Sequence, residues 1–152
     1  MDVSELSSTL SAAGVVISRS DGRTLMVRTH HRTGLVLPGG MVEEGESPAV
    51  AAEREVREEV GLDVRVTRLL AVQHKAADDR APDRYLFDFE CEPLSATPLL
   101  RLQADEIAEV FWLSEEDAVA RHVESGRARL HAAFAARRSG SAAHVDGERV
   151  LT

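Results

Sequence analysis

One helix near the middle of the chain places the tightest constraint on the fold. It lies within the segment from Gly40 to Leu62, which reads GMVEEGESPAVAAEREVREEVGL. Ser47 is a favourable N-cap residue, and Pro48 suits the first helical position because its missing N–H would have no helical partner there. Gly61 tolerates the positive φ with which many helices end. The segment therefore predicts a helix over residues 48–60.

Three glutamates of this helix share one face. Glu55, Glu58 and Glu59 stand at positions i, i+3 and i+4, which lie on the same side of an α-helix. Like charges at this spacing repel by about 0.2–0.5 kcal/mol per pair when solvated, and by more when partly buried. The acidic face therefore needs a compensating charge. An apolar stripe beside it would seat the helix on the core: Ala52, Val56 and Val60.

Two kinds of cation can compensate the acidic face. Arg54 and Arg57 are close in sequence, but they project roughly 90° or more from the middle of the face and cannot neutralise all of it. A site made only of carboxylates favours a hard ion, Mg²⁺ or Mn²⁺, over zinc. On spacing alone, a solvated acidic face and a metal site are equally good interpretations.

The whole pattern of the segment decides between these interpretations. Nine positions match at fixed spacing: Gly40, Glu46, Arg54-Glu55-Val56, Glu58-Glu59 and Gly61-Leu62. This pattern resembles the Nudix box, and the chain therefore resembles the Nudix hydrolases. The resemblance implies an α/β fold, an α/β/α sandwich with a mixed β-sheet.

The resemblance also implies roles for the residues of the box. Glu55, Glu58 and Glu59 would bind the metal, and the carbonyl of Gly40 would add a ligand. Arg54 would orient the carboxylates through an ion pair, and Glu46 would brace the loop that enters the helix.

The general base is open at this stage. Within the box, Glu55 or Glu59 would take the proton of the attacking water. Some members of the family place the base on a loop before a late strand, where this chain offers Glu106 and Glu109. We favour Glu106 of these two, although a solvated loop carboxylate is the simpler interpretation of each.

The remaining sequence predicts strands before and after this helix and two more helices at the end. We expect residues 1–10 to be a flexible N-terminus, residues 11–138 to form a single Nudix-like domain, and residues 139–152 to be a tail. The expected elements are a hairpin of residues 12–18 and 24–28, strands over 63–73, 84–90 and 110–113, a helix capped by Ser114, and a helix over about 126–138.

Composition limits the partners. A net charge of −8 argues against stable binding of a nucleic-acid backbone. Cys91 is the single cysteine, so no internal disulfide forms and a reducing cytoplasm is expected. No apolar segment is long enough to indicate secretion or membrane insertion. We leave the oligomeric state open, with a homodimer as one alternative.

The substrate is not specified by the sequence. Within the family, ADP-ribose pyrophosphatases carry a proline shortly after the box, and dinucleoside polyphosphate hydrolases a tyrosine a little later. Ala77 and Asp78 occupy the first region here, and Pro82 and Tyr85 come later, so neither marker is matched. Nine side chains are candidates for contact with the substrate, although a place in a surface loop or in the core explains each of them as well. They are His30, His31, Arg32, His74, Lys75, Tyr85, Phe87, Phe89 and Trp112.

Two functions from different classes follow. The leading one is a divalent-metal-dependent hydrolase that cleaves the diphosphate linkage of a nucleoside diphosphate joined to another moiety, such as a nucleoside triphosphate or a nucleotide sugar. The alternative is a non-catalytic Nudix-type module that senses a nucleotide or sugar nucleotide. The hydrolase is favoured because every carboxylate of the box is present, whereas a sensing module can lose them.

Overall fold

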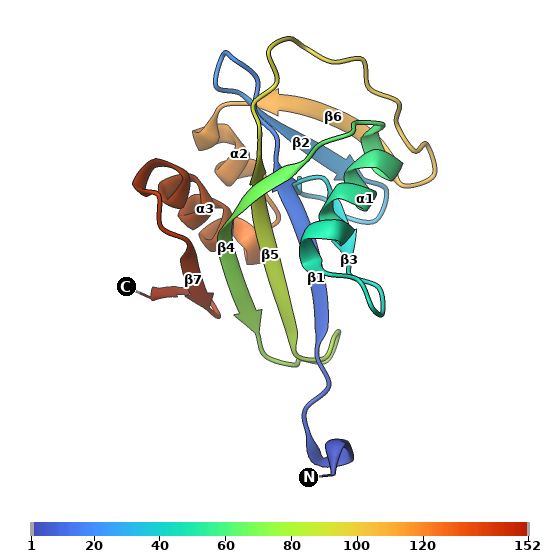
Figure 1. Cartoon of the computed structure of the whole chain (residues 1–152), viewed down its shortest axis with the longest axis vertical. Coiled ribbons are helices and arrows are strands. Elements are labelled where there is room, and N and C mark those ends of the chain that lie inside the picture. The colour runs from blue at the N-terminus through green and yellow to red at the C-terminus, as the bar shows by residue number, and fades with distance from the viewer. Residues whose placement is uncertain (1, 152) are drawn as a thin grey trace.

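The computed structural model describes residues 2–151 (Figure 1). Its strands are β1 (Leu10–Val16), β2 (Thr24–Thr29), β3 (Gly39–Met41), β4 (Val66–Lys75), β5 (Arg84–Cys91), β6 (Ile107–Leu113), β7 (Ala143–Asp146) and β8 (Arg149–Leu151). Its helices are α1 (Pro48–Val60), α2 (Glu115–Arg121) and α3 (Arg127–Ser139), with 3₁₀ turns η1 (Val3–Glu5) and η2 (Glu124–Gly126).

The main sheet is mixed and lies between helices. Its strand order is β3-β1-β5-β4-β7-β8, while β2 and β6 form a separate antiparallel pair. The β1–β5 and β4–β7 pairs are parallel and the other pairs are antiparallel. Helix α1 packs on β1 and β3, and α3 packs on β4 and β7 on the other side of the sheet (Figure 1). The predicted α/β fold with a mixed sheet between helices is confirmed.

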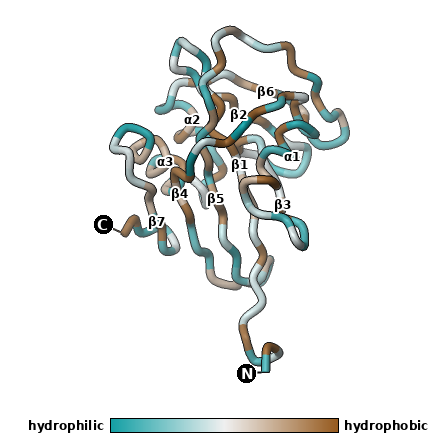
Figure 2. The backbone as a smooth tube through the Cα atoms, in the orientation of Figure 1, coloured by the Kyte–Doolittle hydropathy of each residue, from teal (hydrophilic) through white to brown (hydrophobic). Residues whose placement is uncertain are grey.

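Helix α1 forms as its sequence predicts. Ser47 caps it by accepting a hydrogen bond at Oγ from the Val50 N–H at 3.1 Å, and Gly61 ends it with a φ of 75°. The apolar stripe of Ala52, Val56 and Val60 is fully buried, which stabilises the fold by about 1.5–3 kcal/mol for each valine. The turn that leads into the helix from β3 is hydrophilic (Figure 2). Helix and turn together fix where the glutamates of the box lie.

The predicted hairpin is correct in its turn but not in its strands. The Arg19 N–H donates to the Arg23 carbonyl, and the Leu25 N–H donates to the Ile17 carbonyl. Beyond these bonds the strands diverge, because β1 enters the main sheet and β2 pairs with β6. Residues Thr24–Val27 of β2 are buried, so this strand runs between the two hydrophobic clusters of the core.

The predicted C-terminal tail is wrong. Residues 143–146 form β7, which pairs in parallel with β4, and β8 folds back on β7. Gly140, with a φ of 83°, ends α3 and returns the chain to the sheet, where Val145 is fully buried. At the other end, β1 begins at Leu10 and so includes the last residue assigned to the N-terminus. The flexibility of residues 1–10 stays a prediction, and Met1 lies outside the described residues.

Candidate active site

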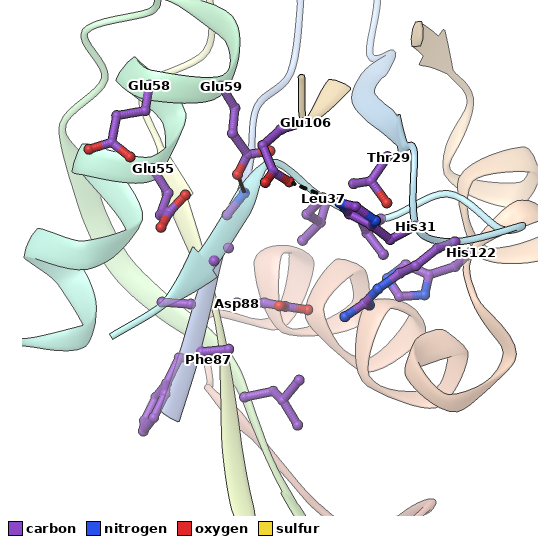
Figure 3. Close-up of a pocket in the computed structure, with 18 of the residues that line it drawn as sticks. Thr29, His31, Leu37, Glu55, Glu58, Glu59, Phe87, Asp88, Glu106 and His122 are labelled. Carbon is purple, nitrogen blue, oxygen red and sulfur yellow. Dashed lines mark hydrogen bonds and ion pairs between the residues drawn. The ribbon is translucent and has the colours of Figure 1, made fainter. Parts of the chain in front are cut away.

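A cleft of about 480 Å³ lies where β1, β3 and β5 meet α1 and the loops before β6 and around α2. The side chains of Glu55, Glu58 and Glu59 gather at one end (Figure 3). His31 and His122 lie at the other end, and Glu106 projects between them (Figure 3). The fold therefore brings the helix of the box together with the predicted Glu106 and with residues from several distant loops.

Two glycines allow β3 to pass close to its neighbours. A Cβ at Gly39 would lie 2.2 Å from the backbone oxygen of Ala13 on the paired strand β1. A Cβ at Gly40 would lie 2.5 Å from the Cδ of Glu55. Gly39 therefore permits the strand pairing, and Gly40 leaves room for the Glu55 carboxylate over its own backbone. The predicted ligand carbonyl of Gly40 and the Glu55 side chain are thus neighbours in space.

Arg54 ties several carboxylates of the box together. Its Nε and Nη2 donate to the two oxygens of Glu46 at 2.8 and 2.9 Å, and its Nη1 donates to Glu55 at 3.0 Å and to Glu58 at 3.3 Å. This two-pronged hydrogen bond lowers the pKa of Glu46 to about 2. Glu46 also accepts from the Glu43 N–H, so it holds both the loop and Arg54.

Glu59 is the carboxylate that Arg54 does not reach. Its residue is 6% exposed, and it accepts a hydrogen bond from the Gly39 N–H at 3.1 Å. Burial, together with smaller contributions from the negative charges of Glu55 and Glu106, raises the pKa of Glu59 to about 8. Among residues 2–151 no cationic side chain forms an ion pair with Glu59. The local arginines therefore leave part of the acidic face uncompensated, because Arg57 turns away to Asp63 at 3.0 Å.

This arrangement fits a hard divalent cation in its chemistry. The donors are carboxylate oxygens and a backbone carbonyl, the ligands that Mg²⁺ and Mn²⁺ prefer. A divalent ion would supply the positive charge that the buried Glu59 lacks. In the described part of the chain, no three acidic or imidazole side chains are grouped as ligands of one ion. Glu55 is hydrogen-bonded to Arg54, and it also lies close enough to Glu59 to raise the pKa of that carboxyl.

The two candidate bases outside the box occupy different places. Glu106 lies in the turn before β6 and lines the cleft, with its carboxylate 3.9 Å from Nε2 of His31. Glu109 lies within β6, opposite Arg28 of β2, and its carboxylate pairs with that arginine at 2.7 Å. It is not among the residues that line the cleft. The geometry therefore favours Glu106 over Glu109 as the candidate base.

His122 is a site residue that the sequence analysis missed. It is 1% exposed, and its Nδ1 lies 2.8 Å from the Val123 carbonyl, which makes Nδ1 the donor and leaves Nε2 as an acceptor. Nε2 has no hydrogen-bond partner among the described residues, and neither has the buried Oγ1 of Thr29, which also lines the cleft. Burial lowers the pKa of His122 to about 4, so this ring is neutral.

A buried ion pair near the cleft was also missed. Asp88 of β5 receives a hydrogen bond at 3.1 Å from Arg129 of α3, and both side chains are buried. Burial raises the pKa of Asp88, and Arg129 opposes this shift. Asp88 is paired with Gly14 of the parallel strand β1. Both residues line the cleft.

The other predicted contacts divide into those inside the cleft and those outside it. His31, Arg32 and Phe87 line the cleft, whereas His30 is bound to the Ala104 carbonyl at 2.8 Å. Lys75 lines a neighbouring cavity. The remaining aromatic and histidine candidates lie elsewhere, against the core or on the sheet surface: His74, Tyr85, Phe89 and Trp112.

Known proteins share this sequence and this fold. A NUDIX domain model matches residues 8–134. A MutT-like protein from Streptomyces ambofaciens is 31% identical over 145 residues, covering 93% of this chain and 86% of that protein. An RNA pyrophosphohydrolase from Photobacterium profundum is 33% identical over 98 residues, covering 61% of this chain and 56% of that protein. A MutT protein from Methanosarcina mazei superposes with a TM-score of 0.73 at 18% identity, over 88% of this chain and 98% of that one.

The family match covers most of the chain, and the box residues lie together at one end of the cleft. The protein therefore belongs to the Nudix family. Its class is that of a Nudix-type pyrophosphohydrolase acting on nucleoside diphosphate derivatives. Proteins of this family typically depend on a divalent metal. In residues 2–151, no helix is both long enough and apolar enough to cross a bilayer.

Proposed function

We propose that the cleft uses Mg²⁺ or Mn²⁺ to hydrolyse the diphosphate linkage of a nucleoside 5′-triphosphate or a closely related nucleoside diphosphate derivative. The observation that carries this proposal is the buried Glu59, which no cation of the described chain pairs with and which lies beside Glu55 and Glu58 in the cleft. A bound divalent metal would neutralise charge on the phosphoryl oxygens and activate the attacking water.

The residues of the chain would divide the remaining work. Glu55, Glu58, Glu59 and the Gly40 carbonyl would hold the metal. Arg54 would position Glu55 and Glu58, because it holds both carboxylates and is itself fixed by Glu46. Glu106 would accept the proton of the attacking water, since its side chain lies in the cleft beside Glu59 (Figure 3).

The end of the cleft that lies away from the carboxylates of the box would hold the nucleoside. Nε2 of His122 can accept a hydrogen bond from a donor of the base or sugar, and Thr29 Oγ1 can donate or accept one. The name of one relative, an RNA pyrophosphohydrolase, agrees with cleavage of a diphosphate linkage in a nucleotide substrate. The net charge of −8 favours a small nucleotide over an extended nucleic acid. We infer a reducing cytoplasm from the single, buried Cys91.

A substrate panel tests the proposal. It contains nucleoside triphosphates, dinucleoside polyphosphates, nucleotide sugars, ADP-ribose and a 5′-triphosphorylated oligoribonucleotide, each with Mg²⁺ or Mn²⁺. Hydrolysis in ¹⁸O-labelled water, followed by mass spectrometry of the products, identifies the phosphorus atom that is attacked. We expect metal-dependent cleavage by the parent and by Glu109→Gln, and its loss in Glu59→Gln. Tight binding of a nucleotide without turnover would instead support the sensing module.

A further inference from the structure

A second cavity, of about 250 Å³, adjoins the cleft and is strongly basic. Four cations line it: Arg32, Lys75, Arg84 and Arg129. They come from the loop after β2, the facing ends of β4 and β5, and the start of α3. Lys75 is the single lysine of the chain, and the chain as a whole carries a net charge of −8. Four converging cations in so acidic a protein require an explanation.

Neighbouring carboxylates balance only half of this charge. Arg129 pairs with the buried Asp88 at 3.1 Å, and Arg84 pairs with Asp78 at 3.4 Å. Arg32 and Lys75 form no ion pair with any described carboxylate. Burial, with smaller contributions from the nearby arginines and opposed by Glu148, lowers the pKa of Lys75 to about 8.

Other groups of the cavity also suit an anion. The Ser125 side chain lines it and offers a hydroxyl donor. Helix α3 has thirteen residues and begins from Gly126, which lines the cavity and provides no side-chain cap. The partial positive charge of this helix end adds to that of the four side chains. Among anions, a phosphate group offers enough acceptor oxygens to engage several of these donors at once.

The cavity and the cleft share part of their walls. Arg32, Leu86 and Arg129 line both spaces, so a ligand that leaves the carboxylate end of the cleft can extend into the cavity. We propose that this cavity is a second phosphate-binding subsite, and that the preferred substrate carries a phosphate on its sugar in addition to the scissile 5′-diphosphate. The subsite itself does not depend on the proposed function, whereas the substrate preference rests on it.

Chemical labelling of Lys75 tests the subsite without turnover. The only amines open to acetylation at pH 8 in EDTA are this side chain and the α-amine, and peptide mass spectrometry measures the two rates separately. We expect inorganic phosphate to slow acetylation of Lys75 by about tenfold or more at saturation, relative to chloride at equal ionic strength, with the α-amine unaffected. Arg84→Gln should weaken this protection. Arg65→Gln, which removes an exposed arginine outside both spaces, should not. Equal Lys75 rates in phosphate and chloride would overturn the proposal.

Kinetics with matched substrates tests the preference. A nucleoside 5′-triphosphate is compared with its 2′- and 3′-phosphorylated counterparts and with a 5′-triphosphorylated dinucleotide, whose sugar phosphate is a diester. We expect at least one added phosphate to raise kcat/KM by about tenfold, through KM, and this gain to disappear in Lys75→Gln. The gain is measured relative to turnover of the plain triphosphate by the same variant.

The pattern of preference identifies the source of the phosphate. A gain with the monoesters alone indicates a small phosphorylated nucleotide, and a gain with the dinucleotide indicates the 5′ end of an RNA. No gain with any of them refutes the preference. If no triphosphate is hydrolysed at all, the proposed function fails, while the labelling experiment still decides the subsite.

Discussion

Replacing Glu59 by glutamine should stabilise the metal-free protein at alkaline pH. The pKa of this carboxyl is raised from 4.5 to about 8 in the fold, so the unfolded chain releases the proton more readily than the folded one. The proton on Glu59 therefore stabilises the folded state. This stabilisation is fully present below pH 4.5 and is lost as the pH rises toward about 8. At 1.36 kcal/mol per pKa unit, ionisation costs the fold about 4 kcal/mol at pH 8. Glutamine avoids this cost, and its Oε1 can still accept the hydrogen bond from Gly39.

Urea unfolding in EDTA between pH 4.5 and 8.5 measures this effect. The free energy of unfolding of Glu59→Gln, less that of the parent, should be near zero at pH 4.5 and about 4 kcal/mol at pH 8. The difference cancels contributions that both proteins share, such as that of His122, whose lowered pKa destabilises the fold below pH 6.5. The control Glu58→Gln removes an exposed carboxylate of the same face, so its curve should run parallel to that of the parent. A difference between Glu59→Gln and the parent that is independent of pH would refute the reasoning.

Three further predictions concern turnover. Arg54→Lys should lower kcat by about tenfold or more, because an ammonium cannot reproduce the pair of hydrogen bonds to Glu46. An effect confined to KM would instead mean that Arg54 binds the substrate. Glu106→Gln should lower kcat by roughly 10²–10⁴-fold with metal affinity nearly unchanged, while Glu109→Gln should retain the kcat of the parent. If Glu106→Gln also retains that kcat, the general base is a glutamate of the box. Gly40→Ala should reduce kcat and metal affinity together, because its Cβ would displace Glu55, and unchanged metal affinity would contradict that contact.

The helix of the box could be predicted because its determinants are local. Ser47, Pro48 and Gly61 define its ends, and a fixed spacing puts the glutamates on one face. Glu106 could be named from the family pattern, but only the fold separates it from Glu109, because the difference depends on where the turn ends and β6 begins.

The features that were missed depend on contacts between distant segments. Strand β7 is four residues long and becomes a strand by pairing with β4, and nothing in its own composition requires this. His122 follows a short helix without a motif, and its importance comes from burial and an unpartnered Nε2. The pair of Asp88 and Arg129 joins residues 41 positions apart. Local periodicity cannot reveal such partners.

Binding of Mn²⁺ to the metal-free protein, followed by electron paramagnetic resonance of the free ion, tests the central claim most directly. The claim is that the glutamate face of α1 holds the metal of a hydrolase. The parent and Glu109→Gln should bind Mn²⁺ with the same dissociation constant, and Glu59→Gln should bind it more weakly by about tenfold or more. If Glu59→Gln binds Mn²⁺ as tightly as the parent, the metal does not lie on this face and the account is wrong.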